Sequence, residues 1–353
     1  MSLPGTTKLS TSTIHNAMAS LTINAFGGAL VDFHLHDSKI NPLSFRFTQD
    51  QMPVNNKSGA PYQGHFLCLG RWGKPSVGET KAGIPDHGHF ANMMWTCSLS
   101  DQGTLNMCAE SELEGLKVDR TIRLDKHLAM YMVDEVVTNI NPLGRLYNIV
   151  QHPTLAAPFL TNNTKIQCNA LKGFHYKNYH DPEKNASNWP YGIGENKTIT
   201  DLRFCDNGVS AVFSFIVNDN SRFGWITAHS PYSQLLIGYL WVRQDYPWIN
   251  LWKDWDKSSI QYCGLEFGTT GIHQPFMEIL EQGKSTIFNK NTFQYIDAGD
   301  VACRRYISFL VETPREFGEI ESVYMDHGFL CIKQHNKDLV MKLNSDLIRD
   351  FVL

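Results

Sequence analysis

Residues 248–271, WINLWKDWDKSSIQYCGLEFGTTG, decide the fold class of this chain. Two runs rich in tryptophan, leucine, isoleucine and phenylalanine flank a short polar segment, WDKS, at residues 255–258. Apolar runs of strand length on either side of a polar turn are typical of a β-hairpin. The stretch therefore predicts two antiparallel strands joined by a tight turn.

Glu266 is the carboxylate of the second run and a candidate general base. If the turn is centred near Lys257, Glu266 lies across from Trp248, and a slip of one residue gives it another neighbour. Alternation places it on one face with Tyr262 and Gly264. A carboxylate among aromatic residues and glycines loses hydration, which raises its pKa towards the range of a useful base. Pairing with a nearby lysine or arginine is an equally good interpretation.

Strands dominate the rest of the chain as well. Alternating apolar and polar residues, the signature of half-buried strands, recur at residues 29–36, 208–217 and 305–312. Helical periodicity is almost absent. The sequence therefore predicts an all-β fold, a large antiparallel β-sandwich with few short helices, that forms a single domain over residues 1–353.

The tail and two long loops complete this pattern. At the tail, apolar runs at 329–333 and 339–343 flank a polar connection, which predicts a terminal hairpin. The last dozen residues fit a helix whose apolar face carries Leu343, Leu347, Ile348 and Phe351. Segments 51–92 and 179–200 have little regular pattern, and long loops in compact domains are often functional.

Composition excludes several classes of protein. Of 353 residues, 42% are hydrophobic and 19% charged, so the chain can bury a large core and is not disordered. A net charge of −4 with scattered lysines and arginines argues against nucleic-acid binding, and no run approaches the ~18 apolar residues of a membrane span. The N-terminal residues lack a signal-peptide pattern and the eight cysteines form no CxxC pair, so we expect reduced thiols in a cytoplasmic protein. The oligomeric state is not indicated.

Two further polar clusters are candidate sites. Residues 85–92, PDHGHFAN, hold His87 and His89 downstream of Arg71. They are either exposed loop histidines or two metal ligands, although no acidic ligand follows at the spacing of a cupin. His152 closes an apolar strand before a proline, where a strand ends or reaches a sheet edge. It is either structural or a proton donor, since its ordinary pKa is ~6.5.

The order of these clusters resembles the aldose 1-epimerase (galactose mutarotase-like) family. The resemblance runs from about Ile23 to Gly271 and rests on an ordered set of short motifs. These motifs are Gly27-Gly-Ala-Leu30, Gly70-Arg71, His87-Gly88, His152 and the Leu265-Glu266-Phe267 segment followed by Thr-Gly. The family implies a β-supersandwich with a small-molecule sugar in an open cleft, and neither a metal nor an organic cofactor.

The resemblance also implies roles for individual residues. Glu266 matches the base that takes the proton of the anomeric hydroxyl, and His152 matches the acid that protonates the ring oxygen. His87 matches a second histidine near the ring oxygen, and Arg71 an arginine that binds sugar hydroxyls. His89 is a further substrate-binding candidate. Four aromatic residues are candidate platforms for the sugar: Trp72, Trp241, Tyr246 and Trp248.

Departures from the family pattern keep other functions open. The second arginine of the Gly-Arg motif is missing, and the family's substrate-binding aspartate has no clean counterpart, with Asp245, Asp254 and Asp256 as nearby candidates. The leading hypothesis is a sugar mutarotase, an isomerase, and the alternative is a non-catalytic carbohydrate-binding protein. A glycosidase using Asp86 or Asp254 with Glu266, and a metal enzyme using the histidines with Glu266, are the remaining hypotheses.

Overall fold

The fold is described from a computed structural model that covers residues 11–100, 103–335 and 340–352. The larger sheet has eleven strands among these residues, and each registered pair is antiparallel. In spatial order they are β1 (Thr11–His15), β2 (Ala19–Asn24), β3 (Ala29–Leu35), β4 (His65–Gly70), β9 (Arg145–Leu155), β19 (Ser259–Gly268), β18 (Trp248–Asp256), β15 (Ala211–Val217), β11 (Ala170–His175) and β12 (Ser187–Asn188), with β22 (Gln294–Ile296) paired to β9.

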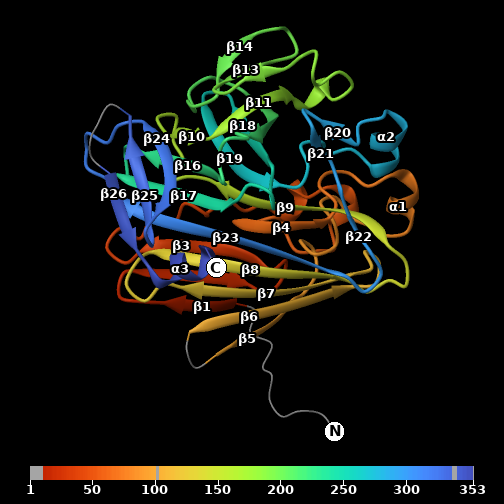
Figure 1. Ribbon diagram of the computed structural model, residues 1–353, viewed down its shortest axis with the longest axis horizontal. Coiled ribbons are helices and arrows are strands. Elements are labelled where there is room, and N and C mark those ends of the chain that lie inside the picture. Colours follow the sequence, from red (N-terminus) through yellow and green to blue (C-terminus); the bar gives the residue numbers. More distant parts are fainter. Residues whose placement is uncertain (1–10, 101–102, 336–339, 353) are drawn as a thin grey trace.

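A second antiparallel sheet packs against the first (Figure 1). Its eight strands are β10 (Lys165–Cys168), β16 (Phe223–Ser230), β17 (Leu235–Val242), β23 (Val301–Glu312), β8 (Met130–Asn139), β7 (Leu116–Leu124), β6 (Thr104–Ser111) and β5 (Thr96–Leu99). Alternate residues of both sheets point into the space between them, where Leu67, Ile149 and Phe267 meet Tyr239 and Tyr306. The predicted all-β, antiparallel sandwich is confirmed, whereas the single domain stays a prediction.

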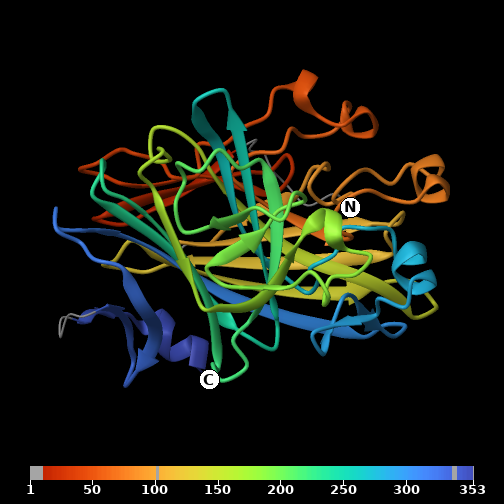
Figure 2. The same ribbon diagram turned by 90° about the horizontal axis from the view of Figure 1, so that it is seen from above.

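The C-terminal residues form a separate layer on the other face of the second sheet (dark blue in Figure 2). This layer consists of β24 (Ile320–Asp326), β25 (Phe329–Gln334), β26 (Val340–Asn344) and α3 (Asp346–Val352). The predicted hairpin strands and helix are confirmed, with Leu347, Ile348 and Phe351 buried. Leu343, however, belongs to β26 and not to the helix, and residues 336–339 of the connection lie outside the described residues.

Loops cover the outer face of the larger sheet. The expectation that 51–92 is one long loop is wrong in its middle, because β4 is a central strand of the larger sheet; around it lie a 3₁₀ turn η2 (Val54–Asn56) and the short helix α1 (Val77–Lys81), with η1 (Gln49–Gln51) at the start. The segment after β19 carries α2 (Phe276–Glu281) and the small hairpin of β20 (Thr286–Ile287) and β21 (Lys290–Asn291). Beyond β11 lie η3 (Tyr176–Asn178), β13 (Tyr191–Ile193) and β14 (Ile199–Asp201). No helix of the described residues is long and apolar enough to span a membrane.

The hairpin of β18 and β19 is confirmed, but its expected register is wrong. Glu266 lies across from Asn250, two residues along from the expected Trp248. The register shifts between Asp254 and Trp255, where β19 contributes the extra residue Gln261, so the turn alone does not set the pairing.

The expectation that His152 marks a strand end or a sheet edge is also wrong. Strand β9 continues through Pro153 to Leu155 and lies between β4 and β19. Its ladder with β19 pairs Gln151 with Phe267 and Thr154 with Gly264, and no pair forms between these two positions. A proline has no N–H to donate, and it is accommodated in a central strand because the ladder is interrupted beside it.

Candidate active site

The register of four neighbouring strands places a row of polar residues on the outer face of the larger sheet. His152 of β9 stands opposite Glu266 of β19, because the flanking pairs on either side share one register. Glu266 pairs with Asn250 of β18, and Asn250 pairs with Ser214 of β15. On the far side of His152, the next position across is Phe66 of β4. The row therefore begins with an aromatic ring and continues with four polar side chains.

A cavity of about 270 Å³ opens above His152 and Glu266. Its walls are largely aromatic, formed by Phe45, Phe47, Tyr62, Phe66, Trp72 and Trp252. Polar side chains that reach it besides the pair are His87, Gln51, Lys74, Asp86 and His273. A cavity of this size suits a monosaccharide-sized ligand, because the pockets of drug-sized ligands begin at ~300 Å³.

His152 and Glu266 are in direct contact at the floor of this cavity. His152 Nε2 lies 3.2 Å from Glu266 Oε1, and the Trp72 indole N–H donates to Glu266 Oε2 at 2.8 Å. Burial raises the pKa of Glu266 well above its ordinary value, although the Trp72 hydrogen bond acts the other way. Burial and the neighbouring His87 and His65 hold the pKa of His152 well below 6.5.

The same burial and charge effects decide which charge state of the pair is favoured. Burial of Glu266 and His152 favours the uncharged forms, in which the carboxyl keeps its proton and the imidazole is neutral. Attraction between opposite charges at 3.2 Å favours the ion pair instead. Both forms contain one proton between Oε1 and Nε2, so the two groups titrate as a coupled pair.

Thr154 fixes the ring orientation and tautomer of His152. Its Oγ1 lies 2.9 Å from His152 Nδ1 and 3.4 Å from the His152 carbonyl oxygen. When the hydroxyl donates to the carbonyl, its oxygen accepts from Nδ1–H, which leaves Nε2 to face the Glu266 carboxyl. Phe66 stacks on the imidazole with a centroid distance of 4.2 Å and an interplanar angle of 21°. The ring is therefore held on two sides.

His87 is a neutral hydrogen-bond donor beside the pair. Its backbone has a φ of 60°, and the following Gly88 has a φ of 83° at a point where a Cβ would meet the Leu69 carbonyl oxygen at 2.2 Å. The Gly73 N–H donates to His87 Nδ1 at 3.3 Å, which leaves the ring proton on Nε2. Burial, with a smaller contribution from His273, lowers the pKa of His87 to about 3.

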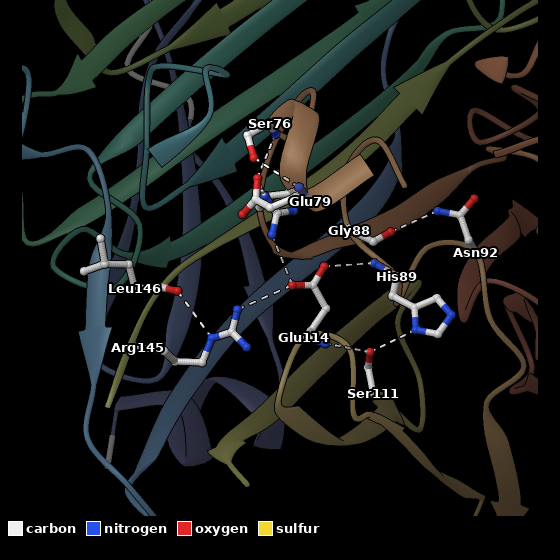
Figure 3. Close-up of polar contacts among 10 residues, drawn as sticks. Ser76, Glu79, Gly88, His89, Asn92, Ser111, Glu114, Arg145 and Leu146 are labelled. Atoms are coloured by element: carbon white, nitrogen blue, oxygen red, sulfur yellow. Dashed lines mark hydrogen bonds and ion pairs between the residues drawn. The ribbon is translucent and has the colours of Figure 1, made fainter. Parts of the chain in front are cut away.

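Arg71 and His89 are not brought to the cavity. Arg71 is buried between two carboxylates, with Nη1 2.7 Å from Glu79 Oε2 and Nη2 3.4 Å from Glu114 Oε2. His89 contacts Ser111 Oγ through Nδ1 at 2.9 Å, and its backbone N–H donates to Glu114. Figure 3 shows Glu114 at the centre of this network. The charge of Arg71 is thus satisfied within the protein.

The expected aromatic platforms divide between the cavity and the core. Trp248 lies outside the cavity in a buried apolar cluster, with its N–H donating to the Asn291 carbonyl. Trp241 and Tyr246 lie between the two sheets, where Trp241 stacks on Phe267 at 4.2 Å. Trp72 does line the cavity.

The sequence reasoning missed Trp252, Thr154 and Asn250. Trp252 lines the cavity with its ring 6.0 Å from that of His152. Asn250 is fully buried and donates to the Thr270 carbonyl, with no partner for its Oδ1. The correct hairpin register would have indicated Asn250 and Trp252, whereas Thr154 is recognised only from its contact with His152.

The hypothesis of two acidic residues has a partial structural counterpart, whereas the described residues offer none for the metal hypothesis. Asp86 lines the cavity together with Glu266, and its Oδ1 accepts from Asn55 at 3.0 Å. Asp254 does not line it. In the described part of the chain, no group of three or more histidine, cysteine, aspartate or glutamate side chains is placed to hold a metal ion.

Comparison with known proteins shows what the fold is similar to. No protein-family model and no curated protein sequence matches the chain. Among solved structures, a galactose mutarotase related enzyme from Lactobacillus acidophilus superposes with a TM-score of 0.60 at 11% identity, covering 86% of this chain and 98% of that one. A galactose mutarotase-like protein from Clostridium acetobutylicum gives 0.60 at 13% identity, covering 86% and 95%.

A third similar structure is a galactose mutarotase-like protein from Lactobacillus casei, with a TM-score of 0.57 at 14% identity, covering 85% of this chain and all of that one. Identities this low establish architecture and not activity. The two-sheet sandwich and these superpositions together show that the chain has the galactose mutarotase-like fold.

Proposed function

We propose that this chain is an aldose 1-epimerase-like isomerase that opens and recloses the ring of a sugar with Glu266 and His152. The observation that carries the proposal is the 3.2 Å contact between Glu266 Oε1 and His152 Nε2 at the floor of a monosaccharide-sized cavity. One side chain has a raised pKa and the other a lowered pKa, as is common for acid–base pairs at functional sites.

The reaction uses the single proton of the pair in its ion-pair form. The Glu266 carboxylate takes the proton of the anomeric hydroxyl while His152 Nε2–H gives its proton to the ring oxygen. The bond between C1 and the ring oxygen breaks, and an open-chain aldehyde forms. After rotation about C1–C2, the reverse steps close the ring on the other face of the carbonyl. The pair holds one proton before and after each step, so no outside acid or base is required.

The surrounding residues prepare these groups for proton transfer. Trp72 occupies Oε2 of Glu266, which leaves Oε1 as the oxygen that faces His152. Thr154 keeps Nε2 of His152 directed at Glu266. The neutral His87 offers its Nε2–H to a ring oxygen or hydroxyl of the sugar. Positioned general acids and bases typically contribute about 10²–10⁴-fold each to a rate.

A non-catalytic carbohydrate-binding protein is the second candidate, because Arg71 lies in ion pairs outside the cavity and leaves few charged side chains to hold hydroxyls. Polarimetry of freshly dissolved α-anomers separates the two candidates. The isomerase accelerates the decay of optical rotation in proportion to protein concentration, and a Glu266→Gln variant binds the same sugar in calorimetry without accelerating it. Sugar binding by the wild-type chain with no acceleration for any aldose would favour the binding protein.

A further inference from the structure

The cavity is chemically different on the two sides of the acid–base pair. On the Glu266 side lie Trp72, whose N–H binds the carboxylate, and His273, whose ring is 5.0 Å from that of Trp72. The buried Nε2 of His273 has no partner. On the far side of His152 lies Phe66, which stacks on it. The pair therefore has polar groups beside Glu266 and an aromatic ring beside His152.

The aromatic side continues beyond Phe66. Tyr62 stacks on Phe66 with centroids 4.8 Å apart and an interplanar angle of 10°. Phe47 lies 6.4 Å from Tyr62 and also 6.4 Å from Trp252. These four rings line a continuous apolar end of the cavity next to His152.

The one hydroxyl in this end of the cavity is already used. Tyr62 donates to the Asp86 carbonyl at 2.7 Å, and its oxygen contacts the Asn56 amide. The ring of His87 lies 5.3 Å from that of Tyr62 and 5.6 Å from that of His152, and we assign its N–H to the ring oxygen. A ligand hydroxyl held against the ring faces of Phe66 and Tyr62, out of reach of Gln51 and Asp86, would therefore give up its water without a replacement partner.

The geometry points to 6-deoxyhexoses, aldopyranoses whose C5 substituent is a methyl group, as the substrates of this site. This inference rests on the proposed function, because the reaction places the anomeric oxygen at Glu266 and the ring oxygen at His152. The ring oxygen joins C1 to C5, so C5 and its substituent lie beyond His152, against Phe66, Tyr62 and Phe47. A methyl group fits an aromatic wall, whereas a hydroxymethyl group places an unpaired hydroxyl there.

Charged substituents at the same position are disfavoured as well. Lys74 is the one lysine or arginine of the described residues that lines the cavity, and its charge acts on both Asp86 and His273 at the rim. A C6 phosphate would lie against aromatic rings in a cavity that also contains the carboxyl groups of Asp86 and Glu266. The electrostatic environment thus offers a phosphate little compensation for lost hydration.

Matched sugar pairs test the inference with the wild-type chain. We would measure kcat/KM for anomer exchange by NMR with D-galactose and 6-deoxy-D-galactose, and with D-glucose and 6-deoxy-D-glucose. Each 6-deoxy sugar is expected to be favoured roughly ten- to hundred-fold, the range in which an apolar pocket rejects an added hydroxyl. Ratios near one, or a preference for the parent sugar or its 6-phosphate, would overturn the inference while leaving the isomerase activity in place. Uncatalysed exchange for every sugar would overturn the proposed function, and this inference with it.

A variant at the rim tests whether the rings set the preference. Phe47 is only half-buried, so Phe47→Asn is tolerated by the fold and gives a C6 hydroxyl a partner. The preference for the 6-deoxy sugar is expected to fall several-fold in Phe47→Asn and to persist in the matched control Phe47→Leu, which stays apolar. An equal preference in both variants would contradict the assignment of this wall to the C5 substituent.

Discussion

Replacing Glu266 by glutamine removes the proposed base and leaves the shape of the site intact. The glutamine carbonyl oxygen can accept the Trp72 N–H in place of Oε2, and the amide can donate to His152 Nε2 in place of the carboxyl proton. Both partners of the carboxyl group therefore remain hydrogen-bonded, and the fold is expected to be retained. The change isolates proton transfer from packing.

The expected loss follows from the role of a positioned base. General base catalysis contributes about 10²–10⁴-fold, which is roughly 3–5 kcal/mol of barrier at 1.36 kcal/mol per tenfold change. The assay is saturation transfer between the anomeric proton signals at equilibrium, compared with the protein-free sugar. Asp254→Asn is a matched control, since Asp254 is a carboxylate of the neighbouring strand that does not line the cavity. A Glu266→Gln variant that keeps more than a tenth of the wild-type rate would refute the assignment.

The same variant makes a prediction about stability. Burial raises the pKa of Glu266, so the folded chain holds a proton that the unfolded chain has released once the pH exceeds about 4.5. The free energy of unfolding of the wild type therefore decreases as the pH rises from 4.5 to the raised pKa, and stays lower above it. Glutamine does not titrate, so the Tm of Glu266→Gln is expected to exceed that of the wild type at pH 7. The gain shrinks as the pH falls towards 4.5 and is lost below it, and a lower Tm at pH 7 would contradict the burial argument.

Three further predictions concern the groups around the pair. Thr154→Val removes the partner of His152 Nδ1 and is expected to lower kcat about tenfold with little change in KM, whereas Thr154→Ser restores kcat. The acidic limb of the pH–rate profile is expected to lie well below pH 6.5, because burial lowers the pKa of His152, and the alkaline limb well above pH 4.5, because burial raises the pKa of Glu266. An acidic limb with a midpoint near 6.5 would show that His152 titrates as an exposed histidine. Arg71→Met leaves the buried carboxylate of Glu114 with Arg145 alone, and is expected to lower the free energy of unfolding by about 3 kcal/mol in denaturant titrations. A raised KM at unchanged stability would instead place Arg71 at the sugar.

Much of the fold could be predicted from the sequence, because strand periodicity is a local property. Alternation along 260–268 indicates which residues share a face with Glu266, and the two runs around residues 255–258 indicate the hairpin. The register is not local in this sense. The turn pairs Asp256 with Ser259, which sets the register one residue away from the expected one. The extra residue Gln261 shifts it by one more, so that Glu266 faces Asn250, and Trp252 instead of Trp248 lines the cavity.

The placement of Arg71 shows a second limit of sequence reasoning. A Gly-Arg motif specifies a short local segment, but the direction of the side chain depends on its partners. Glu79 follows in the next helix, whereas Glu114 comes from the segment before β7, and neither pairing has a sequence signal. Glu266 and His152 are singled out as a pair by the family resemblance and not by their strand contexts alone, and the structure brings their side chains into contact although they are far apart in the chain. Their catalytic roles stay predictions.

The most direct test of the proposed function is saturation transfer on the wild-type chain with 6-deoxy-D-galactose at neutral pH. Irradiating the α-anomeric proton reports each ring opening and closing as a loss of intensity at the β-anomeric proton. The proposal predicts transfer that grows in proportion to protein concentration and disappears in Glu266→Gln. Transfer that stays at the protein-free level across the aldose panel, while the sugars still bind, would contradict it.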